Sequence, residues 1–155
     1  MSERLSSHFS YAELVRSPLA VRHGIDNRVP DADVLAQARA LAVHVLEPIR
    51  RRFGAFSPSS WYRCEKLEWL LCEKQWLRLT PPLAWAEYFA GKQHPKGCAV
   101  DLVLPRVPAE FLFGWMQEAL NFDQLLLEGR DEQAWVHVSY VGNHNRREVH
   151  EIPDP

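Results

Sequence analysis

The segment Gln93–Leu104 reads QHPKGCAVDLVL and combines a turn, an apolar strand and a charge. Lys96-Gly97 predicts the turn, and residues 99–104 predict a strand that Asp101 interrupts. A carboxylate inside an apolar strand is costly unless it is paired or binds a metal. The segment therefore predicts a core strand and, at Asp101, a candidate functional residue.

Downstream of this segment, one helix is followed by a run of strands. Residues 108–120 predict an amphipathic helix, and strands are expected over 122–128, 134–140 and 146–152. His137 lies in the second of these strands as an isolated polar residue, within Trp-Val-His-Val-Ser.

Helices dominate the part of the chain upstream. Ser10 and Glu13 have the spacing of a capping box and open a short helix that ends near Pro18. Apolar residues at helical spacing predict a long helix over 31–53, kinked at Pro48 and closed by Gly54. Because helices come early and strands late, we expect an α+β fold, an antiparallel sheet with the N-terminal helices packed on it.

Residues 65–90 form a Trp-rich stretch, in which we expect helices over 65–77 and 83–90 and a break at Pro81-Pro82. The whole chain has 155 residues and no internal repeat or long linker. This length is typical of one domain, so we expect a single domain over 1–155 that includes the Trp-rich stretch.

The charge balance argues against a nucleic-acid partner. The chain has 18 basic and 20 acidic side chains and a net charge of -2, whereas nucleic-acid-binding domains usually have a basic excess. The run Arg50–Arg52 suits the C-terminal end of the long helix. A DNA-binding module that uses this run lacks a groove-reading motif and is poorly supported.

Neither the cysteines nor the first residues point to an exported protein. Cys64, Cys72 and Cys98 form no CxxC pair, so we expect free thiols. The start, MSERLSSHFSYAEL, has no apolar run and no cleavage site, which predicts neither a secretory signal nor a membrane span. We therefore expect synthesis in a cytoplasm.

Three polar residues combine into a candidate metal site. His94 precedes the glycine turn, Asp101 follows on the next strand, and His137 lies alone in a later strand. Two imidazoles and a carboxylate suit a tetrahedral Zn²⁺ ion, and three protein ligands plus a water are typical of a catalytic site. The sequence therefore predicts one zinc ion per chain.

The same residues carry a family resemblance. Residues 92–101 resemble the S-x-H-x-x-G-x-A-x-D motif of zinc D-Ala-D-Ala carboxypeptidases and related cell-wall peptidases, with Lys92 at the leading serine position. Trp135–Ser139 is similar to the family's W-V-H strand, which carries the third metal ligand. Ser60–Arg63 is similar to its S-G-Y-R segment, with Trp61 at the glycine position.

The resemblance extends over nearly the whole chain, because residues 9–27 and 145–149 are similar to the compact, phage-associated branch of this family. It implies the hedgehog/DD-peptidase fold and a zinc metallopeptidase that acts on peptidoglycan stem peptides. The stretch within about 65–90 departs from the family, whose segment between the Tyr-Arg element and the metal histidine is usually shorter. This departure and Trp61 bear on which substrate is bound.

Hydrolysis at a zinc site also requires a carboxylate that accepts the proton of the attacking water. Glu128, Asp131 and Glu132 precede His137 in the sequence. In the family fold the base lies at the end of the strand that pairs with the W-V-H strand. This resemblance assigns the role to Glu128, with Glu132, in the expected turn, as the second candidate.

Two residues are candidates for substrate binding. A guanidinium binds a carboxylate in a bidentate manner, and peptidoglycan stems end in a free carboxylate. The family's equivalent of Arg63 contacts substrate or the oxyanion of the transition state. Arg63 could instead form a surface cluster with Glu65 and Glu68. Gln93, beside His94, is a candidate hydrogen-bond donor to substrate.

The function expected from these observations is a DD-carboxypeptidase or endopeptidase that reaches the cell wall after lysis or as part of a phage particle. The alternative is a catalytically inactive, zinc-binding relic that recognises peptidoglycan or serves structurally in a phage assembly. The ligands and Glu128 favour the enzyme, whereas the altered Tyr-Arg neighbourhood and the extra stretch favour the relic.

Overall fold

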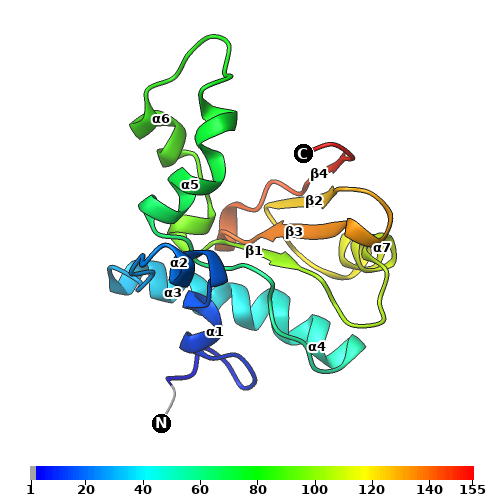
Figure 1. The fold of residues 1–155 in the computed structure, drawn as a ribbon. Helices are drawn as coiled ribbons and strands as arrows, with labels where there is room; N and C mark the ends of the chain where they lie inside the picture. Colours follow the sequence, from blue (N-terminus) through cyan, green and yellow to red (C-terminus); the bar gives the residue numbers. More distant parts are fainter. Residues whose placement is uncertain (1–2) are drawn as a thin grey trace.

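The long N-terminal helix and a four-stranded sheet form the two layers of the structure, a computed structural model that describes residues 3–155 (Figure 1). The chain is α+β, as the sequence predicts. Two short helices, α1 (Tyr11–Val15) and α2 (Pro18–Arg22), precede the long one. The capping box is present, because Glu13 N donates to Ser10 Oγ while the Glu13 carboxylate accepts from Ser10 N.

The long helix runs without interruption through α3 (Ala32–Leu41), one stretch of π-helix, η1 (Ala42–Leu46), and α4 (Glu47–Phe53). Asp31 caps its start, and Gly54, at φ 90°, ends it. Pro48 lacks an N–H and its ring crowds the carbonyl four residues earlier, so the wider hydrogen bonding of the π-helical stretch falls just before it. The predicted irregularity is therefore a π-helical stretch.

The sheet has the strand order β1-β3-β2-β4, formed by β1 (Ala99–Leu102), β2 (Gln124–Glu128), β3 (Trp135–Ser139) and β4 (Glu148–Ile152). β3 pairs antiparallel with β1 and with β2, but β4 pairs parallel to β2. The prediction of an antiparallel sheet is thus wrong for this edge. After β3 the chain returns at the end of the sheet where β2 begins, and β2 has the free edge there, so β4 runs alongside it.

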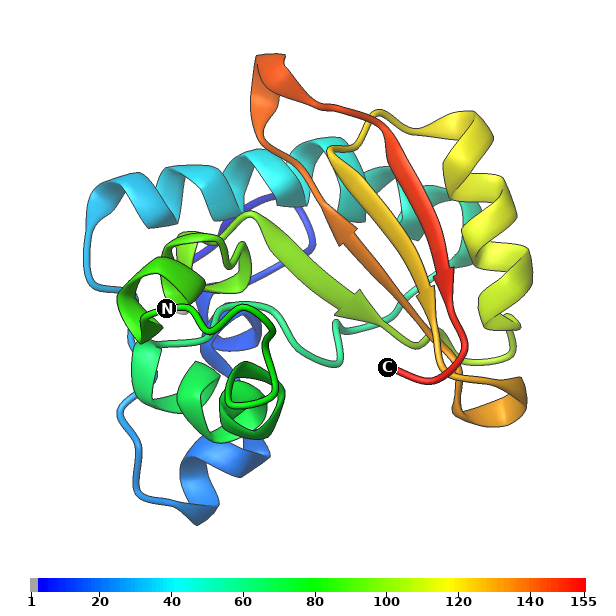
Figure 2. The same ribbon diagram turned by 90° about the horizontal axis from the view of Figure 1, so that it is seen from above.

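One face of the sheet packs against helices. The strand residues on this face are Val100, Leu102, Leu125, Val136 and Val138, all buried in the same core cluster. That cluster also holds apolar residues of the long helix and of α7 (Ala109–Ala119). In Figure 2 the long helix passes behind the strands and α7 lies beside them. The polar residues of β1 and β3 therefore lie on the opposite face.

The Trp-rich stretch forms a helical hairpin of α5 (Glu65–Trp76) and α6 (Trp85–Ala90), close to the predicted ranges. The hairpin projects beyond the end of the sheet at which β1 begins (Figure 1). Its aromatic residues pack on one another: the Trp69 ring lies 5.1 Å from that of Trp76 and 4.7 Å from that of Trp85. Within residues 3–155, no helix is both long and apolar enough to span a membrane.

Candidate metal centre

Asp101 and His137 face each other across neighbouring strands. The antiparallel register of β1 and β3 pairs these two residues directly, and residues paired in this way project from the same face of a sheet. Their neighbours Val100 and Val138 project to the other face, into the core. The two polar residues that interrupt apolar strands thus meet on the face that the long helix leaves free.

His94 joins them from the turn η2 (His94–Lys96), which precedes β1. Gly97 ends this turn at φ 73°, and a Cβ there would lie 2.5 Å from the carbonyl oxygen of Val34 on α3. Only glycine allows this approach, so the glycine of the motif seats the turn on the long helix. His94 Nδ1 donates to the backbone oxygen of Trp61 at 2.6 Å, which leaves Nε2 free to act as a ligand.

The three side chains have the spacing of a metal site. His94 Nε2 lies 3.4 Å and His137 Nδ1 lies 2.9 Å from Asp101 Oδ1, and the three potential ligand atoms lie within 4.8 Å of one another. Bonds of 2.0–2.1 Å in a tetrahedron separate ligand atoms by about 3.3 Å. The donor set and these separations fit a metal ion, and the group is largely buried; zinc as the metal stays a prediction.

Arg63 contacts the metal-ligand candidate Asp101. Its Nη2 donates to Asp101 Oδ2 at 2.5 Å and its Nε donates to Ser60 Oγ at 3.0 Å. The backbone of Ser60 bridges to β1, since Asp101 N donates to Ser60 O at 2.8 Å. Arg63 thus lies beside the three candidate ligands, and its contact with a substrate stays a prediction.

The charges around Asp101 keep it ionised. Burial raises its pKa, but the charge of His94, hydrogen bonds from His137 and His94 and the charge of Arg63 outweigh burial, and the pKa lies well below its usual value. Burial also lowers the pKa of His94, more than Asp101 raises it. Both shifts act in the direction that a divalent cation requires, toward an ionised carboxylate and toward loss of the proton from the imidazole.

Glu128 lies on the same face as the three candidate ligands. It pairs with Trp135 at the end of β2, two residues from the pair of Leu126 with His137, so strand alternation directs it to the side of His137. Burial raises its pKa, and the charges of His137, Asp101 and Arg63 also act on it. A half-buried carboxylate with a raised pKa is suited to accept a proton.

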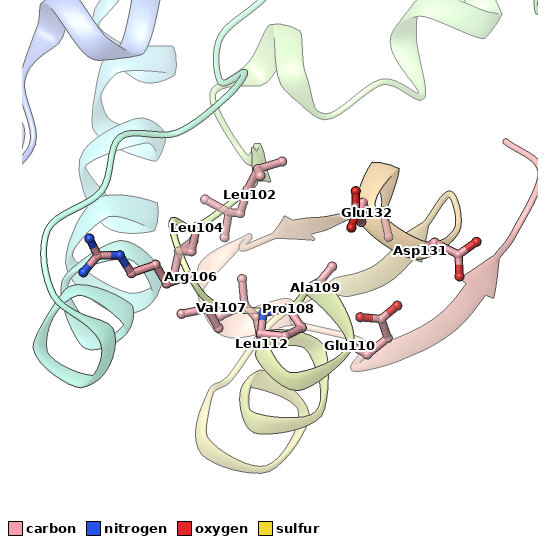
Figure 3. Close-up of a pocket in the computed structure, with 12 residues that line it drawn as sticks. Leu102, Leu104, Arg106, Val107, Pro108, Ala109, Glu110, Leu112, Asp131 and Glu132 are labelled. Atoms are coloured by element: carbon pink, nitrogen blue, oxygen red, sulfur yellow. The ribbon is translucent and has the colours of Figure 1, made fainter.

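Asp131 and Glu132, the other candidates for the base, lie elsewhere. They belong to η3 (Asp131–Gln133), the exposed turn between β2 and β3. Both line a pocket of about 700 Å³ formed with the end of β1 and the start of α7. Figure 3 shows them at one end of this pocket together with Glu110, with Arg106 at the other end. This arrangement agrees with the turn that the sequence predicts for them.

Gln93 contacts a carboxylate that sequence reasoning missed. Its Nε2 donates to Asp123 Oδ2 at 2.8 Å, and Arg146 donates to both oxygens of Asp123. Hydrogen bonds from Arg146 chiefly lower the pKa of Asp123, to about 2. The amide of Gln93 thus ties the His94 turn to the sheet, and contact of Gln93 with a substrate stays a prediction. The sequence contains a signal for Asp123: it lies just after Phe122 and is separated by one residue from the apolar run Leu125–Leu127.

The second missed residue is Glu68, on α5. Only 1% of it is exposed, and its Oε2 lies 3.7 Å from Arg63 Nη1. Its position between the partly buried Cys64 and the buried Cys72, at intervals of four, places it on the inner face of a helix. The sequence places Glu68 only in a surface cluster, whereas the structure buries it behind Arg63.

Comparison with known proteins leaves the resemblance without independent support. No family model matches the chain, and neither a curated protein nor a solved structure matches it. The geometry of the candidate centre is therefore the basis for a functional proposal.

Proposed function

We propose that the protein is a zinc metallopeptidase that hydrolyses a peptide bond in bacterial peptidoglycan stem peptides, as a DD-carboxypeptidase or an endopeptidase. The observation that carries the proposal is the convergence of His94, Asp101 and His137 on one face of the sheet, with Glu128 on the same face. These residues belong to three separate strands and a turn, and their motifs resemble those of zinc cell-wall peptidases.

The chemistry divides between the ion and the chain. When bound by the three side chains, zinc would polarise a scissile carbonyl and lower the pKa of a water. Glu128 would accept the proton of the attacking water on its carboxylate and later donate it to the leaving amine. Because burial raises the pKa of Glu128, the protonated form is more accessible than for an exposed glutamate, which favours the second transfer.

Arg63 is the proposed substrate anchor, in a pocket with further positive charge. The pocket, of about 390 Å³, is lined by Arg16, Arg22 and Arg63 together with three serines, and no acidic side chain is among the described residues that line it. A carboxylate is the ligand that such a set of guanidinium groups binds best. We infer that the pocket receives a carboxylate of the stem peptide.

The test is hydrolysis of defined substrates. Purified protein is incubated with sacculi and with a peptide ending in D-Ala-D-Ala, with zinc or with a chelator, and the products are followed by mass spectrometry. Zinc-dependent release of D-alanine supports a carboxypeptidase, and cleavage within cross-linked stems supports an endopeptidase. Glu128→Gln protein, purified in the same way, should not cleave these substrates. This control excludes cleavage by a contaminating enzyme.

The alternative, an inactive zinc-binding relic, has one observation in its favour. Two nitrogens of Arg63 already donate to Asp101 and Ser60, so less of the guanidinium is free for a substrate. Binding of sacculi without any cleavage at saturating zinc would support this alternative and overturn the peptidase.

A further inference from the structure

Glu68 is a buried acid that the proposed chemistry does not use. It is 1% exposed on α5, and its Oε1 accepts a hydrogen bond from Cys72 Sγ at 3.3 Å. Its Oε2 has no hydrogen-bond partner within residues 3–155. Buried carboxylates are rare and costly unless a charge compensates them, so the neighbourhood of Oε2 shows what compensates Glu68.

The charged group beside Glu68 Oε2 is the guanidinium of Arg63, which lies between two acidic side chains. Its Nη1 is 3.7 Å from Glu68 Oε2, and its Nη2 is 2.5 Å from Asp101 Oδ2. The exposed fractions of the three side chains are 16% for Arg63, 2% for Glu68 and 13% for Asp101. The guanidinium of Arg63 therefore compensates two largely buried carboxylates. One of them, Asp101, is also a candidate metal ligand.

We propose that Glu68 is a positioning residue of the metal centre, which acts by sharing the charge of Arg63 with Asp101. The guanidinium steadies Asp101 through Oδ2, so that Oδ1 stays directed at His94 and His137. Glu68 limits how strongly that guanidinium neutralises Asp101. The inference rests on the proposed metal centre but not on hydrolysis.

Through Glu68, the helical hairpin becomes part of the site. α5 belongs to the stretch of about 65–90 in which the chain departs from the family it resembles, and Glu68 is the residue by which this stretch reaches Arg63. Without the charge of Glu68, the full charge of Arg63 would act on Asp101 and compete with a cation for it. Loss of a group that orients a metal ligand typically lowers metal affinity about 10–100-fold.

The experiment measures zinc affinity by competition with a chromogenic chelator at one fixed pH. Glu68→Gln keeps the shape of the side chain and removes its charge, and it should weaken zinc binding about 10–100-fold. Glu87→Gln, an exposed acid on α6, is the matched control and should bind zinc as the wild type does. Circular dichroism verifies that each variant is folded.

A second pair of variants separates positioning from a general effect of burial. With Arg63→Gln in place, Glu68 has no guanidinium to share, so adding Glu68→Gln should change zinc affinity by less than about twofold. If Glu68→Gln alone fails to fold, Glu68→Asp replaces it: the shorter side chain keeps the charge but draws it away from Arg63, and zinc binding should again be weaker than in the wild type. Wild-type affinity in Glu68→Gln, or an equal loss in both backgrounds, overturns the proposal.

The outcomes also separate this inference from the proposed function. Coupling of Glu68 to zinc affinity through Arg63 can hold in a protein that cleaves no peptide. Conversely, if the protein is a zinc-dependent peptidase and Glu68→Gln does not change its zinc affinity, the proposed function holds and the proposed role of Glu68 is refuted.

Discussion

At the scale of single residues, the candidate centre depends on polar side chains in places where apolar ones would be expected. Asp101 and His137 interrupt apolar strands, and the hydrogen bond between them, at 2.9 Å, offsets part of the cost of burying each. Glu128 and Arg63 complete the group at the same face. Each of these residues can be tested by a substitution that leaves the core cluster untouched.

His94→Ala and His137→Ala should each lose bound zinc, since each removes one of three ligands. Elemental analysis of the purified variants measures the loss. His150→Ala is the control: His150 is exposed on β4, on the far side of β2, and its loss should leave one zinc ion per chain. Full zinc occupancy in both ligand variants would contradict the assignment.

Glu128→Gln should keep zinc and the fold but lose about 10²–10⁴-fold in the rate of hydrolysis, because a positioned acid–base group contributes that much. Since its pKa is raised by burial and the base acts deprotonated, the rate should fall with acidity at a higher pH than for an exposed glutamate. Steady-state kinetics against pH measure both effects.

Glu132→Gln is the matched control for Glu128→Gln, because Glu132 lies in the exposed turn η3. It should retain nearly the wild-type rate. If Glu132→Gln is inactive and Glu128→Gln is active, then Glu132 in the turn is the base and the assignment of Glu128 is wrong.

At the scale of elements, one buried carboxylate joins the His94 turn to the parallel edge of the sheet. Asp123 accepts from Gln93 and Arg146, and its backbone oxygen accepts from Glu148 N at the start of β4. The pKa of Asp123 is about 2 in the folded protein, below its ordinary value of 3.8. A lowered folded-state pKa stabilises the protein above the unfolded-state pKa.

Asp123→Asn should therefore lower the free energy of unfolding by about 1–2 kcal/mol at neutral pH, less than the full linkage value because Arg146 is half-exposed. In the wild type this contribution should vanish as the pH falls from about 4 to about 2, and the variant should lack that dependence. Urea unfolding at several pH values measures it. Asp154→Asn, which breaks an exposed pair with Arg130, should have little effect; equal losses would contradict the argument.

At the scale of the whole molecule, the candidate metal centre and the core lie on opposite faces of the sheet. The core cluster joins the long helix, α7 and the inner strand residues, and its burial does not depend on the three candidate ligands. Stability should therefore come mainly from this core, with an added contribution from zinc that depends on its concentration and affinity.

Chelation should accordingly lower the melting temperature without unfolding the protein at room temperature. Circular dichroism during titration with a chelator measures this, and thermal melts with and without zinc give the size of the shift. Collapse of the spectrum at room temperature would instead indicate a structural zinc site of the kind that folds small domains.

The sequence by itself determined the elements and the candidate ligands. Capping at Ser10, the spacing of apolar residues in the long helix and the alternation in β3 are local patterns, and local patterns set local structure. Asp101 and His137 stood out because a polar residue in an apolar strand needs a partner, whatever the fold.

Only the tertiary structure decided which segments meet. β4 runs parallel to β2 because β3 already has both neighbours, a fact of topology that no local pattern in residues 146–152 contains. In the same way, Arg63 reaches Asp101 across 38 residues of sequence and Gln93 reaches Asp123 across 30. Hydrogen bonds and charges act over a few ångströms in space, so the role of Glu68 appears only when α5 is folded against Arg63.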